Sequence, residues 1–340
     1  MLLCKKKYEE MMQQLGMLKI ISFFLFILFS CSLNSTAQSY SLEIEIKNQT
    51  DNHIFIGSVS GDDFHLTDTI TLRRGQTADT KKAKYSFSEN SVPGMYRLIL
   101  GKTTYAKVMN EPPQQIDFIY NNENIILETD FKKPEEKLLV ILSEENRVWF
   151  EFIRKEKEFQ QQFKNFAIEL AYYRNKTETA QSDSILQQNK LKWEAVATKY
   201  NAIQKQRSDL IAEISERNPE LFATEIIKLY PEPFLNGFLT DKERQEQFQK
   251  NYFESLDFSE ESLINSPVYT DKIFKYLTSY NRPDYTKKQL EQEYIKAVDV
   301  ILPNVNENQK VYEFILDYLV HGFEVLEMES VLNYIAEKYQ

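Results

Sequence analysis

The stretch that decides the fold is residues 149–173, WFEFIRKEKEFQQQFKNFAIELAYY. One set of its positions recurs at intervals of three and four residues, and every member except Glu156 is apolar or aromatic: Trp149, Phe152, Glu156, Phe159, Phe163, Phe166, Leu170 and Tyr173. This spacing places side chains on one face of an α-helix and is typical of helices that pack lengthwise against a partner. The stretch therefore predicts a long helix whose buried face contains a single carboxylate.

A second set of positions with the same spacing follows a polar stretch at residues 175–183. Its members are Leu186, Asn189, Trp193, Val196, Tyr200, Ile203, Arg207, Leu210 and Ile214. Proline, which interrupts helices, is absent from residues 135–218. The two sets together predict an antiparallel helical hairpin over about residues 144–217. Asn218-Pro219 then predicts an N-cap and a proline at the first position of a short helix, and further short helices follow toward residue 340.

Residues upstream of the hairpin have a different composition. Glycines 57, 61, 75, 94 and 101 gather there, and the next glycine is Gly237. Apolar residues alternate with polar ones, as in Leu42, Ile44 and Ile46, which is the period of a half-buried strand. We therefore predict an α+β protein. An antiparallel β-sandwich or open barrel occupies residues 38–133, and an all-α domain with the long hairpin occupies residues 134–340.

The N-terminus indicates export. Residues 20–29, IISFFLFILF, have the length of a signal-peptide core and are too few to span a bilayer. Met17 is the expected true start, and residues 1–37 are the expected signal segment. Two processing routes stay open: cleavage between Ala37 and Gln38, or lipidation of Cys31 within Leu28-Phe29-Ser30-Cys31. A third reading is an uncleaved N-terminal anchor. We predict a periplasmic protein, or alternatively a membrane-anchored lipoprotein held through Cys31.

Charge and cysteine content exclude several functions. The net charge of −10 argues against nucleic-acid binding, which needs clustered basic side chains. Cys4 and Cys31 are the two cysteines of the chain, and both precede Gln38. The segment after Ala37 therefore contains no thiol for disulfide exchange.

The sequence indicates no catalytic, cofactor-binding or metal-binding residues. Asp62, Asp63, His65 and Asp68 come nearest to a metal cluster, but two aspartates and a histidine around a turn are interpreted as a solvated loop. His321 is interpreted as a surface or capping residue near a helix end. Carboxylates converging in a cleft, as in glycoside hydrolysis, remain an alternative.

The order of the elements resembles a known family. The stretches that carry the likeness are residues 93–98 (PGMYRL), 116–120 (IDFIY) with 121–130, 252–258 (YFESLDF), 263–267 (LINSP), 272–277 (KIFKYL) and 328–339 (MESVLNYIAEKY). They resemble the N-terminal accessory region of exported thioredoxin-family proteins of Bacteroidetes, which are related to TlpA-like and AhpC/TSA-like proteins. In those proteins a β domain of unknown function and a helical domain precede the thioredoxin fold.

The resemblance stops short of the family's chemistry, because its Cys-x-x-Cys motif is missing here. Thiol:disulfide oxidoreductase activity would be expected only if a thioredoxin domain follows Gln340. We predict a non-catalytic exported module that is truncated or split from its redox domain. Its expected partner is a protein or peptide, such as a thioredoxin-like protein, and it can form oligomers. The alternatives are an envelope protein that binds a glycan or peptide without any redox role, and a carboxylate-based hydrolase.

Overall fold

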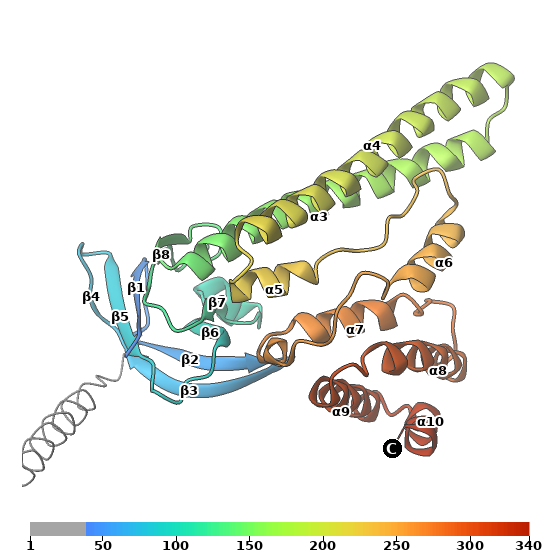
Figure 1. Cartoon of the computed structure of the whole chain (residues 1–340). Helices are drawn as coiled ribbons and strands as arrows, with labels where there is room; N and C mark the ends of the chain where they lie inside the picture. The colour runs from blue at the N-terminus through green and yellow to red at the C-terminus, as the bar shows by residue number, and fades with distance from the viewer. Residues whose placement is uncertain (1–38, 340) are drawn as a thin grey trace, which may run out of the picture. The chain divides into compact units, whose positions relative to one another are not determined.

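The computed structural model describes residues 39–339, so the predictions at Met17, Cys31, Ala37, Gln38 and Gln340 lie outside it. Tyr40–Ser86 and the chain from Ser91 onward form one compact unit, and the short segment Phe87–Asn90 is grouped outside that unit. Strands come first and helices follow, which confirms the predicted α+β class (Figure 1). No described helix is both long and apolar enough to cross a membrane.

The strands form two open sheets. They are β1 (Ser41–Lys47), β2 (His53–Ser60), β3 (Asp63–Thr71), β4 (Arg73–Arg74), β5 (Thr80–Ser86), β6 (Gly94–Gly101), β7 (Gln114–Tyr120), β8 (Ile125–Asp130) and β9 (Leu139–Leu142). One sheet has the order β4-β5-β1-β8-β9 and the other has the order β3-β2-β6-β7, so neither closes into a barrel.

The alternation of apolar residues predicts the buried face of the first strand. Leu42, Ile44 and Ile46 on β1 are each at most 2% exposed, while their sequence neighbours keep contact with solvent. The pairs are antiparallel as predicted, with the exception of β1 and β8, which run parallel. A parallel pair needs a long crossover, and here the chain builds the whole second sheet between these two strands. Strand β9 lies beyond residue 133, in the segment predicted to be helical.

The helices begin directly after β9, apart from a short one in the sheet region, α2 (Thr104–Val108). They are α3 (Glu144–Glu178), α4 (Asp183–Arg217), α5 (Phe222–Lys228), α6 (Asp241–Asn251), the 3₁₀ turn η1 (Glu261–Asn265), α7 (Val268–Thr278), α8 (Lys287–Asn304), α9 (Gln309–Val325) and α10 (Glu329–Lys338). Helices α3 and α4 lie side by side and confirm the predicted hairpin over about 144–217 (Figure 1). Ser143 and Ser182 cap them by accepting a backbone N–H three residues on.

The expected N-cap at Asn218 is wrong. Asn218 closes α4 instead, because its N–H donates to the carbonyl of Ile214. Helix α5 begins four residues later and has no cap from its own side chains. The carboxylate of Glu145 on α3 takes that role and accepts from the N–H groups of Phe222 (3.0 Å) and Ala223 (2.8 Å). A cap supplied by a residue 77 positions earlier is invisible to a local reading of the sequence.

Candidate functional site

The first contact between helices and sheet lies at the start of α3. The side chain of Asn146 accepts from the N–H of Ile119 on β7 (2.8 Å) and donates to its carbonyl (2.7 Å). Asn146 is fully buried and therefore continues the backbone pairing of β7 as a further strand residue would. The carboxylate of Glu123 accepts from Ser143 and from the N–H of Glu144, which anchors the same helix end.

The second contact joins the turn between β2 and β3 to the C-terminal helices. Gly61, at φ +54°, donates its N–H to the carbonyl of Ser266 (3.2 Å). A Cβ at Gly61 would lie 2.8 Å from Thr270 on α7 and 2.9 Å from Phe314 on α9, so only glycine fits this turn. The hydroxyl of Thr270 donates to the carboxylate of Asp62 at 3.0 Å.

A cavity of about 560 Å³ opens beside this second contact. We call it the turn cavity, because the β2–β3 turn forms one wall and α7, α8 and α9 form the others. Its apolar lining includes Phe274, Leu277, Phe314, Val325 and Leu326. Three of these are large exposed side chains at its mouth: Phe274 (60% exposed), Val325 (69%) and Leu326 (53%). Exposed apolar side chains gathered around a concave surface mark a binding site.

The charged groups of the turn cavity are acidic. Asp62 comes from the turn, Asp63 from the first position of β3 and Asp317 from α9, and no lysine or arginine lines the cavity. Burial, followed by the charge of Asp62, raises the pKa of the Tyr318 hydroxyl. Asp271 keeps contact with solvent, yet desolvation by its neighbours, followed by the charge of Asp62, raises its pKa to about 6. The cavity therefore presents a negative field next to apolar walls.

The four residues considered for a metal site are separated. Asp62 and Asp63 line the turn cavity, whereas Asp68 lines a groove between β3 and the five-stranded sheet. Only Asp62 lies in the turn, since the other three belong to β3 and the predicted solvated loop is mostly strand. Within residues 39–339 no group of three or more histidine, cysteine or acidic side chains is placed to hold a metal ion. His321 lies near the end of α9, as predicted, and also lines the turn cavity.

A buried ion pair lies between the two helices of the hairpin. Arg207 on α4 donates to both carboxylate oxygens of Glu156 on α3, at 2.7 and 2.9 Å. Arg207 also donates to the carbonyl of Tyr230 (2.9 Å), and Glu232 lies 3.7 Å from the same guanidinium. Lys275 of α7 pairs with Glu232 at 2.5 Å. These contacts tie the hairpin to α7 and explain why each apolar face contains one charged residue.

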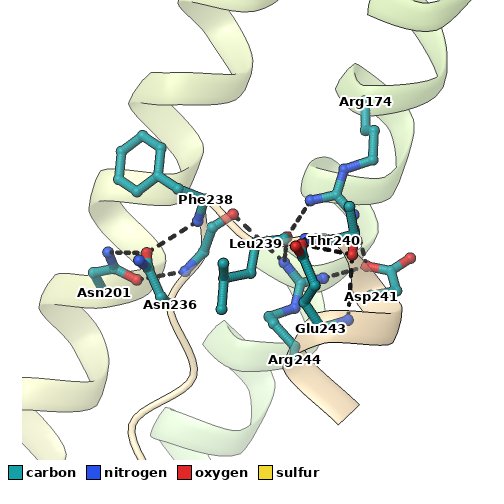
Figure 2. Close-up of polar contacts among 10 residues, drawn as sticks. Arg174, Asn201, Asn236, Phe238, Leu239, Thr240, Asp241, Glu243 and Arg244 are labelled. Carbon is teal, nitrogen blue, oxygen red and sulfur yellow. Dashed lines mark hydrogen bonds and ion pairs between the residues drawn. The ribbon is translucent and has the colours of Figure 1, made fainter. Parts of the chain in front are cut away.

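The segment between α5 and α6 crosses the hairpin and is held by side-chain contacts to its backbone (Figure 2). Asn201 accepts from the N–H of Gly237 at 2.7 Å, and Arg174 donates to the carbonyl of Leu239. Arg244 donates to the same carbonyl at 3.1 Å. Gly237 lies so close to α4 that a Cβ would come within 2.9 Å of the carbonyl oxygen of Ala197. This crossing segment therefore holds the hairpin in place and is a structural feature rather than a site.

Comparisons with known proteins return no match: no family model, curated protein or solved structure is similar to this chain. The candidate site consequently stands on geometry alone. Sequence reasoning identified Asp62, Asp63 and His321 but did not join His321 to the two aspartates, because it lies more than 250 residues after them in the chain. It missed Phe274 and Asp317 entirely, since an exposed residue on a helix carries no local signal of a cavity.

Proposed function

We propose that this chain is a non-catalytic binding module and that the turn cavity holds a segment of a protein or peptide partner. One observation carries the proposal: a cavity of about 560 Å³ whose mouth is formed by the exposed side chains of Phe274, Val325 and Leu326. Its size is in the range of ligand pockets, and its lining combines apolar walls with a few polar groups that would orient a ligand.

The alternative of a glycan-binding sheet receives less support. Sugar recognition on a sheet relies on exposed aromatic rings that stack on the ligand. On the described strands Phe55, at 40% exposure, is the one large aromatic side chain that is exposed. A single ring does not form a stacking platform, so the turn cavity is the better candidate.

The test is selection of linear peptides from a random phage library on the full chain. We expect binding of the selected peptides to be lost with Phe274→Ala, because this removes a wall of the cavity mouth. The matched control is Phe234→Ala, which removes another exposed ring (50% exposed) from the crossing segment and should keep binding. Peptides that bind all three proteins equally would show that the turn cavity is not the site.

We further propose that the module is exported and serves thiol–disulfide chemistry carried out by another domain or a thioredoxin-like protein. The support is the signal-like N-terminus and the family resemblance described above. The intact mass of the protein from its own cells tests this. A mass that matches cleavage before Gln38, or a lipid on Cys31, would support export, and an unprocessed chain would contradict it.

A second candidate function, a carboxylate-based hydrolase, is favoured by one observation. Desolvation, followed by the charge of Asp62, raises the pKa of Asp271 to about 6, and a carboxyl group with a raised pKa suits the general acid of such an enzyme. The test is release of p-nitrophenol from p-nitrophenyl glycosides and esters by the full chain. Activity that Asp62→Asn abolishes would support it, and no release above buffer would exclude it for these substrates.

A further inference from the structure

We propose, on the basis of the proposed function, that the partner segment presents a basic side chain, lysine or arginine, and that its cation lies among Asp62, Asp63 and Asp317 of the turn cavity. The first step of the argument is charge. Three carboxylates line the cavity, and lysine and arginine are absent from the lining. A chain with a net charge of −10 also attracts basic partners over a distance.

The second step is that these carboxylates differ in the hydrogen bonds they make. Asp62 accepts a hydrogen bond from the hydroxyl of Thr270 at 3.0 Å, which fixes the position of its carboxylate. Asp63 and Asp317 make no side-chain hydrogen bond or ion pair with any residue in the described part of the chain. One oriented and two unpaired carboxylates around a cavity form a ready receptor for an external cation.

The third step is the apolar wall. The methylene stem of lysine or arginine packs against apolar surface while its charged end reaches polar groups. Phe274, Phe314 and Tyr294 line the same cavity and offer aromatic faces to such a stem and to the cation itself. A metal ion would use the carboxylates but leave these rings without a role, and the described carboxylates are not arranged as a metal site.

The experiment compares two peptides on the full chain by isothermal titration calorimetry: acetyl-Leu-Lys-Leu-amide and the same peptide with norleucine in place of lysine. Norleucine keeps an apolar stem and lacks the charge. We expect the lysine peptide to bind at least about ten-fold more tightly, and we expect this preference to shrink as salt rises.

The variant pair Asp63→Asn and Asp317→Asn, combined in one chain, should remove the preference for lysine, so that the lysine peptide binds no more tightly than the norleucine peptide. Both positions are exposed, so the fold is expected to be kept, and circular dichroism checks this. The matched control is Glu313→Gln, an exposed acid on α9 outside the cavity lining, which should keep the preference.

The remaining outcomes separate a failure of the cation proposal from a failure of the proposed function. Equal binding of the two peptides by the unmodified chain would overturn the cation proposal and leave the proposed function standing. A loss of preference with Glu313→Gln as large as with the cavity variant would also overturn it, because the effect would then be general charge. Absence of binding by either peptide at millimolar concentration would overturn the proposed function together with this inference.

Discussion

Replacing either member of the Glu156–Arg207 pair is expected to destabilise the protein far more than replacing both. The two side chains are 10% and 7% exposed, and two parallel hydrogen bonds join them. Arg207 has two other acceptors, the carbonyl of Tyr230 at 2.9 Å and the carboxylate of Glu232 at 3.7 Å. Glu156 has one other donor, the amide of Gln160 at 2.6 Å.

The magnitudes follow from what each substitution leaves behind. Removing one partner of a buried ion pair costs about 3–5 kcal/mol, because the other charge stays buried without compensation. Glu156→Leu should lower the free energy of unfolding by about 3 kcal/mol, since Arg207 keeps its other acceptors. Arg207→Met should lower the free energy of unfolding by about 5 kcal/mol, since Glu156 keeps only an amide and the half-buried carbonyl of Tyr230 loses its donor. The free energy of unfolding of the double variant should lie within about 2 kcal/mol of that of the unmodified protein, because apolar replacement of a whole buried pair is often neutral.

The assay is urea unfolding at pH 7, followed by circular dichroism and by tryptophan fluorescence. One of the two tryptophans, Trp149, packs with its ring centroid 6.2 Å from that of Tyr230. The matched control is Asp209→Ala, which breaks the exposed pair with Lys205 and should change stability by less than about 1 kcal/mol. A double variant that loses the sum of the two single losses would refute the reasoning, because the two charges would then act independently.

Three further predictions concern single positions. Gly61→Ala, at φ +54° and with a Cβ 2.8 Å from a methyl group of α7, should lower stability by about 1–3 kcal/mol in a urea titration, whereas Gly322→Ala, whose Cβ meets open space within α9, should not lower it. Burial lowers the pKa of Lys272 to about 8, so the unfolded chain binds more protons between pH 8 and 10.5 and this residue's contribution to stability rises with pH across that window. Lys272→Met should therefore stabilise the protein at pH 7 and lose that advantage by pH 10.5. Melting curves of both proteins at several pH values test this, and a difference in melting temperature that stays constant with pH would contradict it. Asn146→Ala should cost about 2–4 kcal/mol, because both backbone groups of Ile119 lose their partner, and a change below about 1 kcal/mol in urea unfolding would contradict the role assigned to it.

Much of the fold could be predicted because its signals are local. The three-and-four spacing from Trp149 onward encodes a helix, and α3 and α4 begin and end close to the predicted limits of the hairpin. The alternation of apolar and polar residues around Leu42 predicts a strand and indicates which of its faces is buried. Each of these patterns depends on neighbours within a few residues, so it can be read without knowing where the rest of the chain lies.

The site could not be predicted in the same way, because its parts meet only after the helices have packed. Asp62 and Asp317 belong to opposite ends of the chain, and no spacing rule relates them. The parallel pairing of β1 with β8 and the capping of α5 by Glu145 could not be predicted for the same reason. Each depends on the position of a distant element, which is set by packing.

The sequence by itself therefore determined the order of strands and helices and the long hairpin, and its net negative charge disfavours nucleic-acid binding. Glu156 and Arg207 stand out in the sequence as two separate charged residues on apolar faces, and the antiparallel packing of α3 against α4 makes them a pair. The tertiary structure likewise decided that Asp62, Phe274 and Asp317 share one cavity. The physical reason is that periodicity reports which side of an element is buried, whereas a binding site depends on which elements are buried against each other.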